Sequence, residues 1–131
     1  MPQQPAGSSI SVVPASDYVV ALSGQLGATA KSHEPASNTA AVVTLAVPGS
    51  GISHVLYSVA WSYDGDPTGG ALTITIDAAT WFKVDIVKAG PGQFAFDPPL
   101  KATANKQVVV TLAAGGSGVS GIVNVHAGTE S

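Results

Sequence analysis

Short segments in which apolar and polar residues alternate constrain this chain most, and Gly- and Pro-rich turns separate them. In the segment 71–77 (ALTITID), leucine and isoleucine occupy every second position, and 81–87 (WFKVDIV) repeats the pattern. A period of two is that of a half-buried β-strand, whose successive side chains point to opposite faces of a sheet. No window of helical length shows the apolar period of a helix, so the sequence predicts an all-β domain.

Seven segments carry this strand pattern, at 40–47, 52–63, 71–77, 81–87, 92–97, 106–114 and 121–127. Their regular spacing, with turn residues between them, is typical of an antiparallel β-sandwich or barrel of seven or eight strands. The expected core consists of the inward-facing positions of three of these strands: Leu72, Ile74, Ile76, Phe82, Val84, Ile86, Val108, Val110 and Leu112.

The segment 52–63 (ISHVLYSVAWSY) is the longest predicted strand. A strict period of two places one set of residues on each face: Val55, Tyr57, Val59, Trp61 and Tyr63 against His54, Leu56, Ser58, Ala60 and Ser62. Because Trp61 shares its face with valines and tyrosines, we expect its indole ring to be packed.

The first 37 residues differ in composition from the rest. They are rich in Pro, Ser, Ala, Gly and Gln, and two apolar runs interrupt them at 10–13 (ISVV) and 18–22 (YVVAL). We expect residues 1–37 to be an extended arm with one or two short strands that packs against something, and residues 38–131 to be one β domain. A partly disordered terminus is the alternative for the arm.

Charged residues make up only 10% of the 131 residues, against roughly 25% in ordinary globular chains. The chain has five lysines, no arginine, a formal net charge of −3 and no cysteine. This composition argues against direct binding of nucleic acid or of an acidic membrane surface, and it excludes disulfides and thiolate metal sites. The start lacks the features of a secretory signal, so we expect a soluble protein made in a cytoplasm.

The acidic turn 64–67 (Asp-Gly-Asp-Pro) resembles the start of a calcium-binding loop. Counted from Asp64, the twelfth position of such a loop is Thr75, where a bidentate glutamate is required, and a strand follows rather than a helix. We therefore interpret Asp64 and Asp66 as turn residues whose carboxylates accept backbone N–H groups. A calcium site remains the alternative.

The sequence offers few residues for catalysis. His33, His54 and His126 lie in different segments, no serine lies in a nucleophile elbow, and the Gly-rich stretches lack the lysine of a phosphate loop. We therefore expect no enzyme activity, no catalytic residues, no cofactor and no metal. Two alternatives stay open: a histidine cluster formed in three dimensions or at an oligomer axis, and sugar binding by an exposed Trp61 or Trp81.

Residues 52–125 contain an ordered series of motifs. They are W-S-Y at 61–63, P-T-G-G at 67–70, V-D-I at 84–86, G-P-G at 90–92 before an aromatic strand, P-L at 99–100, and V-T-L-A-A-G-G-x-G-V-x-G at 110–121. In this order they resemble a group of small β-proteins of tailed bacteriophages and prophages.

The resemblance implies a jelly-roll domain that acts as a capsid decoration, or cement, protein of the virion. Such proteins typically form homotrimers on the capsid exterior and clamp neighbouring subunits of the major capsid protein. A tail or fibre module is a second possibility within the resemblance. Outside it, the competing reading is a β-sandwich module that binds glycans or a host surface.

Overall fold

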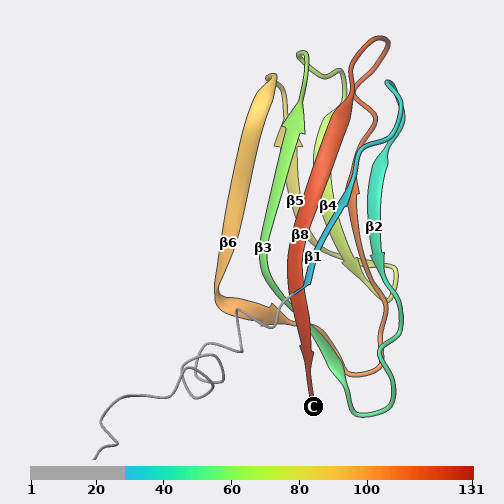
Figure 1. Cartoon of the computed structure of the whole chain (residues 1–131), viewed down its shortest axis with the longest axis vertical. Coiled ribbons are helices and arrows are strands. Elements are labelled where there is room, and N and C mark those ends of the chain that lie inside the picture. The colour runs from blue at the N-terminus through green and yellow to red at the C-terminus, as the bar shows by residue number, and fades with distance from the viewer. Residues whose placement is uncertain (1–28) are drawn as a thin grey trace, which may run out of the picture.

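A computed structural model describes residues 29–131 of the chain (Figure 1). This part contains no helix. It forms eight strands: β1 (Thr29–His33), β2 (Ala41–Leu45), β3 (Ser53–Tyr63), β4 (Gly70–Ile76), β5 (Ala79–Ile86), β6 (Gly90–Lys101), β7 (Val108–Leu112) and β8 (Gly121–Glu130).

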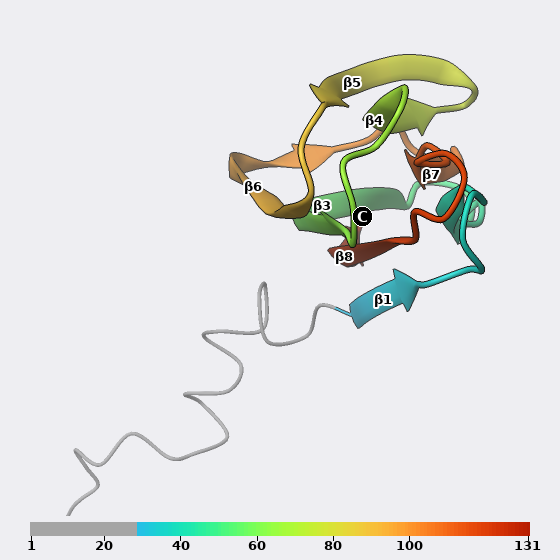
Figure 2. The same cartoon turned by 90° about the horizontal axis from the view of Figure 1, so that it is seen from above.

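The strands form two four-stranded sheets, in the orders β1-β8-β3-β6 and β2-β7-β4-β5, and every neighbouring pair is antiparallel. Consecutive strands mostly alternate between the two sheets, which is the connectivity of a jelly roll. Figure 2 shows the sheets facing each other, with β5 and β6 along one side and β1 on the other. The prediction of an all-β, jelly-roll-like antiparallel sandwich is confirmed.

The core lies between the two sheets and draws on both. Of the nine expected core residues, Leu72, Ile74, Val108, Val110 and Leu112 have no exposed surface, and Ile86 is also buried. The other three, Ile76, Phe82 and Val84, pack against the core but are only partly buried. The other large side chains with less than 2% exposed surface come from the opposite sheet: Leu56, Val59, Tyr63, Val123 and Val125.

The two faces of β3 differ from the expected alternation because the strand contains a β-bulge. The register of β3 against both β6 and β8 shifts between Leu56 and Ser58, which leaves Tyr57 as the extra residue. Leu56 and Val59 therefore both belong to the core, although they are three positions apart. The strict assignment of Leu56 and Val59 to opposite faces was wrong, whereas Trp61 packs against the core as predicted.

The described part of the range 1–37 contains one strand, β1. Strand β1 lies within the range assigned to the arm, and it pairs with β8 from Thr29 opposite Ala127 to His33 opposite Val123. All five β1 residues are exposed, so their sequence (TAKSH) carries no apolar period that would reveal a strand. The two apolar runs at 10–13 and 18–22 lie outside the described residues.

Candidate functional site

Four connections meet at one end of the sandwich, which we call the loop end: β1–β2, β3–β4, β5–β6 and β7–β8. The amide of Asn38 donates to the carbonyl oxygen of Val119 at 2.8 Å, and the amide of Thr68 donates to that of Gly115 at 2.8 Å. The β7–β8 connection is thus hydrogen-bonded to two of the other three. These bonds satisfy backbone groups that the sheet ladders leave free.

The carboxylates of Asp64 and Asp66 tie the β3–β4 connection to the β7–β8 and β5–β6 connections. The Asp64 carboxylate accepts the amide of Ser120 at 2.7 Å, and the Asp66 carboxylate accepts the amide of Ala89 at 2.8 Å. Asp64 also donates its own amide to the carbonyl oxygen of Ser120 at 3.0 Å. The two carboxylates thus serve as backbone acceptors, which agrees with their interpretation as turn residues.

The packing of the Tyr63 ring accounts for two glycines of the β7–β8 segment, Gly115 and Gly121. The buried Tyr63 ring packs against Gly115 and Gly121, because a Cβ added at either glycine would lie 3.1–3.2 Å from carbons of the ring. A Cβ added at Gly121 would also lie 2.8 Å from Leu112. The Tyr63 hydroxyl donates to the carbonyl oxygen of Ala113 at 2.6 Å. Burial raises the pKa of the Tyr63 phenol above its ordinary value of 10.0.

Trp61 occupies a similar position beside β6. It lies opposite Gly92 in the β3–β6 ladder, and a Cβ on Gly92 would lie 2.4 Å from two carbons of the indole ring. Only a glycine therefore lets the indole lie flat over β6. Gly70 likewise leaves room for the Pro67 ring, because a Cβ added at Gly70 would lie 2.7 Å from that ring.

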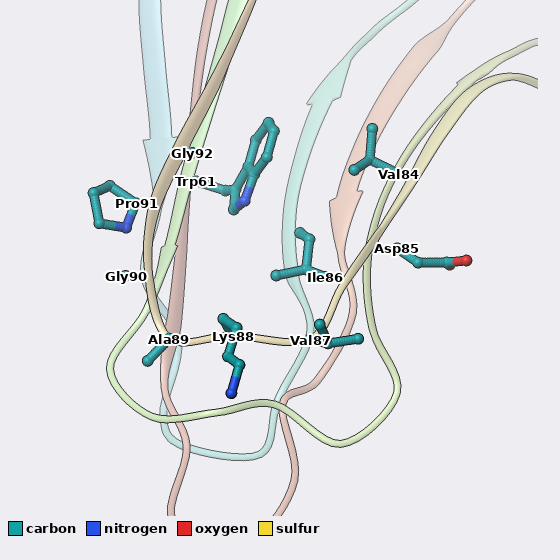
Figure 3. A pocket seen from close by; sticks show the side chains of 10 residues that line it. All are labelled: Trp61, Val84, Asp85, Ile86, Val87, Lys88, Ala89, Gly90, Pro91 and Gly92. Carbon is teal, nitrogen blue, oxygen red and sulfur yellow. The ribbon is translucent and has the colours of Figure 1, made fainter.

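A shallow groove of about 280 Å³ lies beside Trp61. Its wall consists of the end of β5, the β5–β6 connection and the start of β6, residues 84–92. Figure 3 shows Trp61 and Ile86 projecting into the groove, whereas the carboxylate of Asp85 points away. The groove is lined mainly by apolar side chains and backbone, and its two ionisable lining residues are Asp85 and Lys88.

Four of the six motifs that carry the phage resemblance therefore meet at the loop end. W-S-Y supplies Trp61 and Tyr63, while P-T-G-G, G-P-G and the Gly-rich ending supply the glycines and loop contacts that surround them. These four motifs have packing roles at the loop end, whereas P-L lies toward the other end of β6, where Leu100 pairs with Leu56. The sequence predicted the individual turns but not their common location.

The edge strands β5 and β6 lie along one side of the sandwich, which we call the open side. Four aromatic rings on this side form a second candidate site, which we call the aromatic edge: Trp81 and Phe82 on β5, Phe94 and Phe96 on β6. The ring centroids of Phe82 and Phe94 are 4.9 Å apart, and those of Trp81 and Phe96 are 5.6 Å apart. These rings join the edges of the two sheets. All three phenylalanines of the chain belong to this cluster.

A β-bulge in β5 brings two neighbouring residues into the cluster. The β4–β5 ladder pairs Ile74 with Phe82 and Thr75 with Thr80, so Trp81 is the extra residue. Trp81 and Phe82 stack at 5.8 Å with an interplanar angle of 28°, where strict alternation would have separated them. Sequence reasoning named these aromatics, but a period of two could not group them.

The aromatic edge remains partly open to solvent. Phe96 is buried, but 47% of the Trp81 surface and 41% of the Phe94 surface are exposed. Within residues 29–131, β5 pairs only with β4 and β6 only with β3, so each strand has a free backbone edge beside the exposed rings. Exposed apolar surface next to an unpaired strand edge is typical of an interaction site.

The three histidines are separate. His54 is buried, and its Nε2 lies 2.6 Å from the carbonyl oxygen of Ala46. His33 accepts the amide of Val42 on its Nδ1 at 2.9 Å, and His126 lies exposed on β8. No group of three or more histidine, aspartate or glutamate side chains within residues 29–131 is placed to hold a metal ion.

The same range of residues has no helix of the length and apolarity that would cross a membrane.

No protein-family model matches the sequence, and no curated protein matches it. Among solved structures, the chain is similar to the CBM36-1 domain of a multidomain xylanase from the hindgut metagenome of Trinervitermes trinervoides. The two are 11% identical with a TM-score of 0.44, over 74% of this chain and 75% of that one.

It is also similar to a chain of the capsid of Helicobacter pylori bacteriophage KHP30, with 14% identity and a TM-score of 0.40 over 79% of this chain and 99% of that one. A third similar structure is the insecticidal delta-endotoxin Cry8Ea1 from Bacillus thuringiensis, with 12% identity and a TM-score of 0.42 over 95% of this chain and 22% of that one. At such identities the similarity is one of fold.

Proposed function

We propose that this chain is a structural protein of a tailed-phage virion: a capsid decoration protein that binds the outside of the major capsid protein lattice as a homotrimer. One observation carries the proposal. The motifs that resemble such phage proteins occur in order along residues 52–125, and four of them (W-S-Y, P-T-G-G, G-P-G and the Gly-rich ending) meet at the loop end around Trp61 and Tyr63. The resemblance thus concerns the residues that set the packing of the domain, and it is more specific than a set of unrelated turns.

The surface of the described domain suits a protein that acts by contact. Beyond its bulge, β3 turns Ser58, Ala60 and Ser62 away from the core, and none of them carries a charge. The exposed rings of Trp81 and Phe94 add apolar surface along the open side. Weakly charged faces lose little free energy of desolvation when another protein covers them.

A decoration protein of this kind would stabilise the head by mass action. Each copy that bridges two or more capsid subunits adds its binding free energy to the assembled shell and not to the separate subunits. Simultaneous contact with several subunits also gains from multivalency, so each individual patch can be modest.

The test compares phage particles with and without the gene for this chain. Particles that lack the protein should assemble, but they should release DNA at a lower temperature or under milder osmotic shock. Adding the purified protein back should restore the wild-type threshold. Unchanged release thresholds, or failure of the heads to form, would contradict the decoration role.

A glycan-binding or host-binding module is the second candidate, and Trp81 favours it, because an indole that is about half exposed can stack against a sugar ring. Copy number separates the two functions, since a decoration protein should be present in hundreds per particle and a tail or fibre module in a few dozen at most. Binding of the isolated protein to immobilised polysaccharides, lost in Trp81→Ala, would support the second candidate.

A further inference from the structure

The aromatic edge offers two things to an extended peptide. The free backbone edges of β5 and β6 provide unpaired N–H and C=O groups, and Trp81 and Phe94 provide exposed apolar rings beside them. A segment that pairs with such an edge gains main-chain hydrogen bonds, and its side chains gain apolar contacts. A suitable occupant is therefore a short apolar run in extended form.

The chain itself contains such a run. Residues 18–22 (YVVAL) are apolar and rich in residues that favour strands, and seven Cα steps separate Leu22 from Thr29, where β1 begins. Strand β1, through which the run is connected to the sandwich, forms the edge of its sheet opposite to β6.

Distance decides whose aromatic edge the run can reach. Lys31, Val125, Val59 and Phe94 lie in one row across the sheet β1-β8-β3-β6. A strand beyond β6 would therefore be four strand spacings from β1, or about 19 Å, and the chain would also have to rise over the sheet and descend by about 5 Å each. Seven extended steps span at most about 25 Å, less than the roughly 29 Å needed.

We propose that residues 18–22 of one copy bind the aromatic edge of a second copy. The run is connected to β1, and the aromatic edge includes β6, the opposite edge of the same sheet. Each copy can therefore provide its run to one neighbour and its aromatic edge to another. A head-to-tail contact of this kind closes into a ring if the rotation between copies permits it. The inference concerns only contacts between copies, so it stands or falls independently of capsid binding.

Cross-linking tests the contact directly, because the chain has no cysteine of its own. Ala21→Cys and Gln93→Cys are introduced into separate, differently tagged chains that are expressed together. A short bismaleimide should then link the two chains in the purified complex. Gln93 is chosen because it is exposed on β6 next to Phe94. The matched control pairs Ala21→Cys with Thr44→Cys, which is exposed on β2 at the opposite side, and should give no link.

The linked product should fall at least tenfold when Trp81→Ser and Phe94→Ser are added to the Gln93→Cys chain, or when Val20→Asp is added to the Ala21→Cys chain. A link formed within one chain that carries both cysteines would show that the run binds its own aromatic edge, and would overturn the proposal. So would the absence of any link in complexes that light scattering shows to be oligomeric. A monomer at high concentration would overturn it as well.

Discussion

The loop end and the aromatic edge both concentrate unusual residues, but they use them in opposite ways. At the loop end, the Asp64 carboxylate, the Tyr63 hydroxyl and the glycine beside Trp61 each have a contact within the domain. At the aromatic edge, Trp81 and Phe94 keep nearly half of their surface exposed. The comparison shows that the four motifs at the loop end belong to the scaffold, whereas the surface available for binding consists of aromatic rings on β5 and β6 that lie outside these motifs.

The largest effect on stability should come from removing the Tyr63 ring at the loop end. Tyr63→Ala removes a fully buried ring, so we expect a loss of about 3–5 kcal/mol in the free energy of unfolding, as for other buried aromatics. Denaturant titration measures it. A loss below about 1 kcal/mol would show that the glycine-lined packing around this ring contributes little.

A smaller effect should follow when a methyl group is added beneath Trp61. In Gly92→Ala the new Cβ would lie 2.4 Å from the indole, and we expect about 1–3 kcal/mol of destabilisation from overpacking. Gly65→Ala is the matched control, since its Cβ would meet only a valine methyl at 3.4 Å. Equal melting temperatures of the two variants would contradict the close approach of Trp61 and β6.

The acidic turn distinguishes a hydrogen-bonded connection from a calcium site. Asp64→Ala removes the acceptor of the Ser120 amide and should cost about 1–2 kcal/mol, while Asp64→Asn keeps an oxygen acceptor and should cost less. Thermal melting of the wild-type protein should be the same in calcium and in chelator. A calcium-dependent rise in melting temperature that Asp64→Asn abolishes would restore the metal interpretation.

The raised pKa of Tyr63 predicts that the free energy of unfolding falls in alkaline solution. The folded-state pKa of its phenol is raised, so its contribution is fully present below about pH 10, and it is lost as the pH rises above that value through the folded pKa. Tyr63→Phe should cost about 1 kcal/mol at neutral pH through the lost hydrogen bond to Ala113, and should flatten this alkaline loss. Unfolding curves recorded from about pH 8 upward check this, because the free energy of unfolding should begin to fall through Tyr63 only above about pH 10.

The smallest effect on folding should come from the aromatic edge. Trp81→Ser should change the free energy of unfolding of a single domain by less than about 1 kcal/mol, because the indole is half exposed. The same variant should lower the oligomeric mass measured by light scattering. A large loss of stability without any change in association would place Trp81 with the scaffold rather than with the binding surface.

The sequence predicted the parts of the fold that alternate. The period of two in β4, β5 and β7 identified their core positions, because each of these strands has one face against the opposite sheet. It failed where the ladder is irregular. The bulges at Tyr57 and Trp81 shift the period by one residue, and β1 has no buried face to reveal it.

The candidate sites were predictable only in part. Turn chemistry indicated the role of Asp64 and Asp66, but their partners Ser120 and Ala89 are far away in sequence, and only the fold brings them together. The aromatic cluster likewise depends on two strands from different sheets that meet along one side. Local patterns carry no information about such long-range pairs.

A reconstruction of the intact phage particle by electron cryomicroscopy tests the central claim most directly. The account predicts density for this sandwich on the outside of the head, in contact with several major capsid protein subunits. It also predicts that Trp81 and Phe94 are covered by a neighbouring copy. Density confined to the tail or fibres, or no copies on the head, would contradict the assignment as a capsid decoration protein.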